Sequence, residues 1–232
     1  HLTGSNAQVR SIGDETFSGA GTIAFEGTTG LTRHLTIEGA STLTLAPTFT
    51  VTGGLGTIGS QAEVGGTNHL VNQGTIKTTG PGQSLTLAPT GAWTNSGTID
   101  VRGGGTVNLG GSLTTADVTA GHLLRDGASV VNLTGALTNT GTTLTLNAAT
   151  GSWNLVGGSI TGGTVTLVEG ATLLINTTGG TGTLTGVALT GDVTVSGTSA
   201  ALRISGGLTL NGVVHLTGSN AQVRSIGDET FS

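Results

Sequence analysis

The chain has 232 residues, enough for one sizeable core or for a stretch of a repetitive rod. It contains 44 Gly and 47 Thr, but glycine does not recur at every third position, so a collagen triple helix is excluded. Hydrophobic residues make up 34% and the mean hydropathy is positive, which argues against disorder. Charged residues make up only 8% and the formal net charge is −5, so the basic surface that nucleic acid or an anionic membrane would need is excluded.

Three features that the sequence lacks lead to expectations about the protein's location and about whether the sequence is a piece of a longer chain. No apolar run reaches the length of about 18 residues that a membrane-spanning helix needs, so we expect no membrane insertion. Cysteine is absent, which avoids cross-linking in an oxidising compartment and favours an extracellular protein of the bacterial cell surface. Because the sequence has neither a Met nor a signal peptide at its start, we expect it to be a piece of a longer chain.

The segment HLTGSNAQVRSIGDETFS occurs at positions 1–18 and returns without a change at positions 215–232, so the offset is 214. Such identity predicts a tandem array in which 1–214 form one full repeat and 215–232 begin the next. The alternative is an artificial duplication that caps the fold. Under either interpretation the end of one unit must join the start of another, and we expect neighbouring repeats to be partners, head to tail.

Shorter motifs recur along the repeat, several of them after about twenty positions or a multiple of this spacing. GTI occurs at 21–23, 56–58, 74–76 and 97–99, LTLAPT at 43–48 and 85–90, and TGAW at 90–93 is echoed by TGSW at 150–153. A period of about 20 or 21 residues fits one coil of a β-solenoid, so one repeat predicts about ten coils.

The local pattern is that of β-strands. Polar and apolar residues alternate at 42–45, 143–146, 164–167 and 192–195, which directs Leu and Val inward and Thr outward. Thr suits a strand because its branched side chain is restricted, and glycine pairs between the runs allow the chain to turn. Pro47 and Pro89 follow such strands, where a missing amide hydrogen costs no ladder bond.

Asn72, Asn95 and Asn139 stand beside glycine at strand edges. Asparagines at equivalent corners of a solenoid can stack and bond along its axis. Ordinary turn residues in the left-handed conformation are the other interpretation. The sequence leaves both open.

The TLTL, GTI and N-x-G-T-I strings in a Cys-free, Gly/Thr-rich chain resemble bacterial right-handed β-helix surface proteins, of the autotransporter-passenger and filamentous-haemagglutinin kinds. The resemblance is one of texture over the whole chain, and no functional residue is carried over from it. It implies an all-β fold, a single-stranded β-solenoid (right-handed parallel β-helix), and a role in adhesion, cohesion between cells or as a stalk. Identical repeats of this length are closer to giant repetitive surface filaments.

The charged residues predict no active site, because the twelve Asp and Glu are scattered. A coil of about 20 residues would bring three sets of opposite charges near one another, for which we expect surface ion pairs. The sets are Asp14 with Arg33 and His34, Arg102 with Asp126, and Asp100 with Arg125. We therefore expect no enzyme and no catalytic residue.

Other motifs are incomplete. The five histidines lack metal-ligand spacing, Gly103-Gly104-Gly105 lacks the Asp of a calcium repeat, and no GK[ST] follows the glycine-rich 179–186, so we expect neither metal nor cofactor. The sequons at Asn132 and Asn176 are expected to be coincidental in a bacterial protein. Trp93 and Trp153 predict core or corner packing, with an exposed sugar-stacking face as the alternative.

Three functions remain. Identical copying favours a structural segment of a long secreted filament or stalk that assembles end to end, with lateral self-association as a further expectation. A hydroxyl-rich face suits an adhesin that contacts glycans or a host or neighbouring cell surface. Rows of Thr on a flat face suit ice binding, but LTL recurs along the sequence after steps of 42, 59 and 64, which predicts interrupted rows.

Overall fold

A computed structural model describes residues 1–26, 32–59, 63–78, 80–119 and 121–230. The chain is all-β, with 53% strand, and its parallel sheets stack as a β-solenoid of about nine turns. The parallel solenoid predicted from the sequence is therefore confirmed, with about nine turns where about ten coils were predicted; handedness stays a prediction. The chain divides into two compact units, His1–Val130 (unit 1) and Val131–Ser232 (unit 2).

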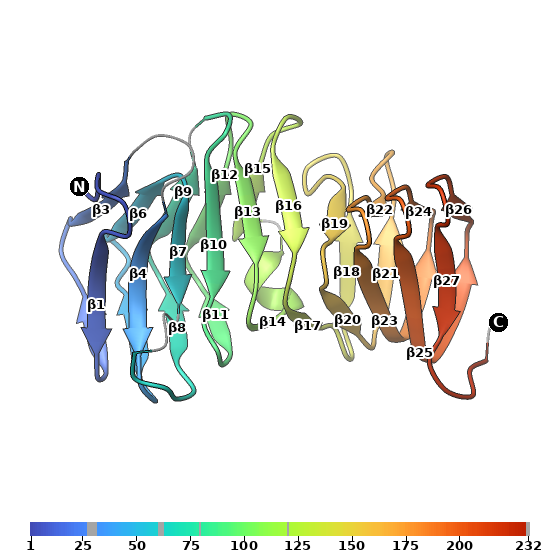
Figure 1. Cartoon of the computed structure of the whole chain (residues 1–232), viewed down its shortest axis with the longest axis horizontal. Helices are drawn as coiled ribbons and strands as arrows, with labels where there is room; N and C mark the ends of the chain where they lie inside the picture. Colours follow the sequence, from blue (N-terminus) through green and yellow to red (C-terminus); the bar gives the residue numbers. More distant parts are fainter. Residues whose placement is uncertain (27–31, 60–62, 79, 120, 231–232) are drawn as a thin grey trace. The chain divides into compact units, whose positions relative to one another are not determined.

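Each turn of unit 1 has three strands, which we call the first, second and third arm in chain order. Equivalent arms of successive turns pair in parallel, and Figure 1 shows the first arms side by side. The first arms are β1 (Gln8–Ile12), β4 (Arg33–Glu38), β7 (Gly56–Gly59), β10 (Ser84–Ala88) and β13 (Thr106–Leu109). The second arms are β2 (Glu15–Phe17), β5 (Thr42–Leu45), β8 (His69–Asn72), β11 (Trp93–Asn95) and β14 (Ser112–Thr114). The third arms are β3 (Thr22–Phe25), β6 (Thr50–Gly53), β9 (Thr75–Thr78), β12 (Thr98–Val101) and β15 (Leu123–Arg125).

Unit 2 keeps the same three arms, with one difference: β23 and β25 each run through a second and a third arm without a break. The first arms are β16 (Val130–Leu133), β19 (Trp153–Leu155), β22 (Leu173–Ile175), β24 (Val193–Val195) and β26 (Val214–Leu216). The remaining arms are β17 (Ala136–Thr138), β18 (Thr143–Leu146), β20 (Ser159–Thr161), β21 (Thr164–Leu167), β23 (Thr181–Thr190), β25 (Ala201–Asn211) and β27 (Gln222–Ser225). Between β14 and β15 of unit 1 lies a 3-10 turn, Thr115–Val118.

The turns are longer in unit 1 than the motif spacing predicts. Successive register partners on its first arm are Gln8, His34, Thr57, Thr86 and Asn108, so the numbering advances by 26, 23, 29 and 22 per turn. In unit 2 they are Val131, Trp153, Leu173, Val193 and Val214, with steps of 22, 20, 20 and 21. The predicted period is thus right for unit 2 and too short for unit 1. The longest turn contains the connection from β7 to β8, whose extra chain no local alternation signals.

The core is a set of aliphatic columns. In unit 1, Leu35, Ile58, Leu87 and Leu109 are register partners on the first arm and all are fully buried. Burial of each such side chain contributes about 1.5–3 kcal/mol, and the alternate residues of the same strands face outward. The inward-aliphatic, outward-polar pattern predicted from alternation is confirmed.

The GTI motif has its glycine because successive turns approach closely there. A Cβ atom on Gly74 would lie 2.3 Å from the carbonyl oxygen of Phe49, and one on Gly97 would lie 2.2 Å from that of Gly74. Both distances are far below van der Waals contact, so only glycine fits. At 74–76 and 97–99 the motif marks the corner that precedes the third arm, whereas its copy at 56–58 lies in the first arm β7.

Candidate functional site

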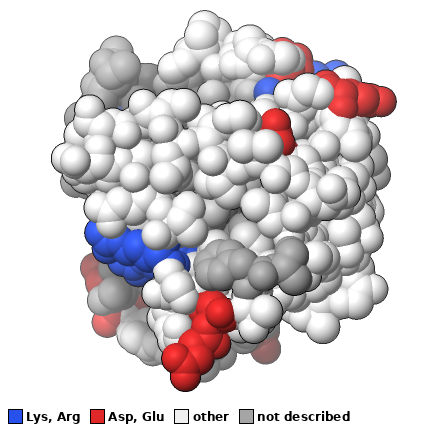
Figure 2. Space-filling view, turned by 90° about the vertical axis from the view of Figure 1, so that its right-hand side faces the viewer, with Lys and Arg blue, Asp and Glu red and all other residues white. Residues whose placement is uncertain are grey.

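Charged side chains are few on the surface shown in Figure 2, which is dominated by uncharged residues. Among the described residues, the ion pairs of unit 1 are His1–Glu26, Arg10–Glu63 and Arg102–Asp100, and in unit 2 His215 lies 3.3 Å from Asp192. Of these, the Arg10 pair belongs to a polar network that joins two strands to a connection, and this network is the candidate site considered first.

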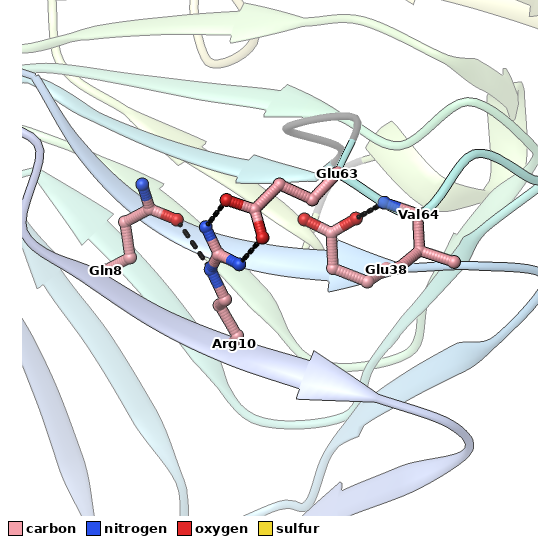
Figure 3. A network of polar contacts seen from close by, with 5 residues as sticks. All are labelled: Gln8, Arg10, Glu38, Glu63 and Val64. Carbon is pink, nitrogen blue, oxygen red and sulfur yellow. Dashed lines mark hydrogen bonds and ion pairs between the residues drawn. The ribbon is translucent and has the colours of Figure 1, made fainter.

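Arg10, on β1, is held from two sides (Figure 3). Its two terminal guanidinium nitrogens donate to both carboxylate oxygens of Glu63, and its Nε donates to Oε1 of Gln8 at 3.0 Å. The side-chain hydrogen bond raises the pKa of Arg10 and lowers the pKa of Glu63. The pair is bidentate, so it fixes orientation as well as charge.

Beside this pair, Glu38 of β4 is buried, and its Oε2 accepts the backbone amide of Val64 at 2.9 Å (Figure 3). The amide of Gly39 in turn donates to the carbonyl of Val64 at 2.9 Å. Glu38 and Glu63 therefore anchor the chain at 63–64 over the strands β1 and β4. The guanidinium, the Glu63 carboxylate and Oε2 of Glu38 are engaged in this anchoring, so the network is a latch between turns, while Oε1 of Glu38 is buried without a hydrogen-bond partner among the described residues.

The charge pairs expected from a coil of fixed length are mostly absent because the actual turns are longer. Asp14 accepts the amide of Thr42 at 2.8 Å, while Arg33 lies buried and donates to the carbonyl of Thr3 at 2.8 Å. The set of Asp14 with Arg33 and His34 is therefore not an ion-pair cluster. Burial lowers the pKa of His34, which favours its neutral form.

Of the two expected pairs near β12, Arg102 and Asp126 come near enough for their charges to interact, although no ion pair joins them among the described residues, and Asp100 with Arg125 differs from the structure. Arg102 binds Asp100, two residues earlier on the same face, with Nε to Oδ1 at 2.7 Å. Asp126 accepts the Ser129 hydroxyl and the Gly103 amide, the latter at 2.6 Å, and these hydrogen bonds lower its pKa. The hydrogen bond to Asp100 raises the pKa of Arg102, and the charge of Asp126 adds to this.

The expected pair of Asp100 with Arg125 is wrong because the register places Arg125 opposite Val101 and not opposite Asp100. Burial lowers the pKa of Arg125. Asp100 thus pairs with Arg102 along one strand, and Asp126 accepts a backbone amide of the neighbouring turn.

The asparagines at strand edges form a buried ladder, which settles the two interpretations for Asn72 and Asn95. These two are register partners, and Nδ2 of Asn72 donates to Oδ1 of Asn95 at 2.8 Å. Asn95 then donates to the carbonyl of Asp117 at 2.9 Å. Asn139 is also buried and donates to the carbonyl of Thr164 at 2.8 Å. None of the three has a positive φ, so the turn interpretation is wrong for them.

A second asparagine ladder runs on the outside of unit 2. Nδ2 of Asn154 donates to Asn132 at 2.8 Å, and Nδ2 of Asn176 donates to Asn154 at 3.3 Å. Two of its members are the sequon residues Asn132 and Asn176. The side-chain amides of Asn132 and Asn176 therefore hydrogen-bond between successive turns.

Both tryptophans are buried, at 1% and 0% exposure, as the core-packing interpretation predicts. The indole nitrogen of Trp93 donates to the carbonyl of Gly110 at 2.8 Å, and that of Trp153 to the carbonyl of Thr150 at 3.3 Å. The alternative of an exposed pair that stacks on sugars is therefore wrong.

Threonine columns are the surface feature that the sequence argument missed. On the third arm of unit 1, Thr22, Thr50, Thr75 and Thr98 are consecutive register partners. Unit 2 has Thr138, Thr161 and Thr185 on the second arm, and Thr145, Thr166 and Thr190 on the third. Each column is continuous over three or four turns, because Leu, Val and Ile all serve as inward residues beside the threonines. In unit 2 the columns then end, where Thr185 faces Ser205 and Thr190 faces Asn211, so the rows are interrupted as predicted.

One hollow of about 300 Å³ lies in unit 2 between second and third arms. Gly163, Gly186, Gly206 and Gly207 contribute to its lining, with Thr209 and Thr230. None of its described lining residues has a titratable side chain, so these residues offer no acid or base. Among the residues that the structure describes, no group of three or more His, Asp or Glu could hold a metal ion.

Within the described part of the chain, no helix has the length and apolar character to cross a membrane. Searches against protein-family models, curated proteins and solved structures find no match for this chain.

Proposed function

We propose that the chain is a structural repeat segment of a long secreted bacterial surface filament or stalk, extended by copying and assembled end to end. The observation that carries the proposal is the behaviour of the segment that occurs twice, at 1–18 and 215–232. The second copy adopts the local structure of the first and adds the next strands to unit 2. A stack that ends by beginning its own sequence again can continue without a cap.

The two copies agree in detail. Asn6 and Asn220 have φ of 53° and 55°, and Gly13 and Gly227 have φ of 88° and 96°. Arg10 donates to Gln8 in the first copy, and Arg224 donates to Gln222 in the second, at 2.7 Å. The segment therefore forms the same turn and the same strand in both copies, although the strands with which it pairs differ.

The test is a chain with one more repeat, in which an extra copy of 1–214 precedes the full sequence. We expect one continuous rod, longer by about 45 Å at a rise of about 4.8 Å per turn, and a higher melting temperature because a repeat interface is added. Small-angle scattering and thermal unfolding measure both. The control places a Gly/Ser linker between the repeats; it should keep two short rods and gain no stability. Equal lengths or equal stabilities for the two chains would count against a filament.

A second candidate, ice binding, is favoured by the threonine columns of unit 2. Their hydroxyls and methyls repeat at the strand spacing of about 4.8 Å, on a sheet surface that is regular in two directions. Thermal hysteresis tests it: Thr166→Lys, in the middle of a column, should abolish the activity, whereas Thr44→Lys, outside these columns, should not. Absence of hysteresis in the unmodified chain removes this candidate and leaves the filament proposal standing. The adhesin alternative stays a prediction.

A further inference from the structure

The two copies of the duplicated segment occupy different arms. In unit 1, Leu2 bridges Phe25 of the third arm β3, and Gln8–Ile12 pairs with the first arm β4. In unit 2, Val214–Leu216 pairs with the first arm β24, and Gln222–Ser225 pairs with the second-arm part of β25. The same sequence has moved forward by one arm.

Counting along the chain gives the same result. Twenty-six strand steps separate β1 from β27, and β23 and β25 each span two arms. The separation is therefore 28 arms, which is nine turns and one arm. This count follows from the order of strands in the chain and from the sheet in which each strand pairs.

We infer that each repeat of the array contains nine and one-third turns, so that every repeat begins one arm later than the repeat before it. The partner is the next copy of this chain, and the inference rests on the proposed function only in taking the array to continue.

Together the two copies define what lies on each side of a repeat junction. The strand Gln222–Ser225 has β25 below it, and its first copy has β4 above it. The segment 214–216 has β24 below it, and Leu2 has Phe25 above it. On the remaining arm, the Leu208 amide donates to the Thr230 carbonyl at 3.1 Å below, and Glu15–Phe17 pairs with β5 above.

The segment can pair with either arm because the neighbouring strands, β4 and β25, each direct one Leu and one Ile into the core beside it. Val9 and Ser11 stand opposite Leu35 and Ile37, which are fully buried. Val223 and Ser225 stand opposite Leu202 and Ile204, which are also buried. An aliphatic column thus continues through the junction although it passes from one arm to another.

The junction also explains the position of the latch. Arg224 is the register partner of Arg203, and like charges directly opposite each other are destabilising. In the first copy, Arg10 engages Glu63 from its own repeat. Each added repeat therefore brings the carboxylate that neutralises the arginine pair at its own entrance.

The consequence is that the repeats of a filament would be related by a shift of one arm each, so that three repeats complete one cycle. A surface feature of one repeat recurs on a different arm in the next and returns to the same arm only after three repeats. Three repeats contain 28 turns, or about 134 Å at about 4.8 Å per turn. Lateral contacts through one arm of a repeat therefore point in three directions along the array.

The absence of Cys makes a direct test simple in the full chain. The pair Arg203→Cys and Arg224→Cys joins register partners on neighbouring parallel strands, at a spacing that a disulfide can span. The comparison pair, Thr194→Cys and Arg224→Cys, would be adjacent only if the second copy stacked in phase with the first arm. Thiol titration after mild oxidation measures the free thiols that remain in each variant, and far-UV circular dichroism checks that both variants fold.

We expect the first pair to oxidise and the second to stay reduced. Oxidation of the second pair, of both pairs or of neither would overturn the one-arm shift. These results are independent of the lengthening experiment. If the comparison pair oxidises but the two-repeat chain forms a longer rod, the one-arm shift is wrong and the filament proposal stands. A two-repeat chain that fails to lengthen removes the filament itself.

Discussion

At the scale of single residues, the interior of unit 1 combines aliphatic columns with a polar ladder. Asn72, Asn95 and Asp117 are almost fully buried and bonded to one another across turns. Buried polar groups stabilise a fold only while they are satisfied, because an orphaned one costs about 1–3 kcal/mol. The ladder therefore ties the arms to one register as well as filling the core.

We expect Asn95→Ala to lower the free energy of unfolding by about 1–3 kcal/mol, since it leaves the Asn72 amide and the Asp117 carbonyl without this partner. Asn154→Ala is the matched control, because it interrupts an amide ladder on the outside, where water can replace the bonds. Chemical denaturation of both variants measures the difference. Equal losses would mean that burial does not decide the cost.

The Arg10–Glu63 latch predicts a pH dependence. The folded-state pKa of Glu63 is lowered by the hydrogen bond from Arg10, so the unfolded chain binds its proton more readily. The stabilisation is present above the unfolded pKa, about 4.3, and is lost as pH falls through the folded value. The melting temperature of the wild type should exceed that of Glu63→Gln at pH 7, and the two should converge in acid. A gap that stays constant from pH 7 to acid would contradict a role for the charge.

At the scale of elements, alternation in the sequence identifies the strands well but not the length of a turn. Thr42–Leu45 and Thr164–Leu167 are strands as predicted. The turn length was not predictable because connections such as that from β7 to β8 carry extra chain outside any repeating motif. Charge pairs inferred from a fixed period, such as Asp100 with Arg125, were wrong for the same reason. The threonine columns were missed because exact strings were compared, although inward Leu, Val and Ile are interchangeable.

The corner between second and third arms in β23 is made by one residue. A register irregularity lies between Thr185 and Val187, and Gly186 there has φ of 58°. Alanine at this position should cost about 1–2 kcal/mol, because a side chain disfavours the left-handed region. Gly127→Ala is the control: an added Cβ there meets nothing within 4 Å. Thermal unfolding should show a loss for the first variant and no loss for the second; two equal effects would place the strain elsewhere.

At the scale of the whole molecule, the described end of unit 2 is an open edge. Leu216, Val223 and Ile226 are exposed by 48%, 38% and 48%, whereas Leu2, the first copy of Leu216, is 8% exposed. Coverage by following strands accounts for the difference. An uncovered strand edge is also a place where another chain can pair.

Val223→Asp should therefore lower the melting temperature, because a charge then faces the buried Leu202. It should also reduce self-association, because a charge on an open strand edge opposes pairing with another chain. Each kcal/mol corresponds to about 2–4 °C for a chain of this size. Arg224→Asp is the neighbouring control; its side chain points outward and opposite Arg203, so stability should hold or rise. Scanning calorimetry and light scattering measure both effects. A harmful Arg224→Asp beside a neutral Val223→Asp would reverse the assignment of faces.

Unequal turn lengths give such a rod a direction. Four turns of the first arm advance the chain from Gln8 to Asn108 in unit 1, but only from Val131 to Val214 in unit 2. On average, a turn of unit 1 therefore contains more residues than a turn of unit 2. If the chain is repeated head to tail, as we propose, long and short turns alternate along the array, and their order distinguishes its two ends.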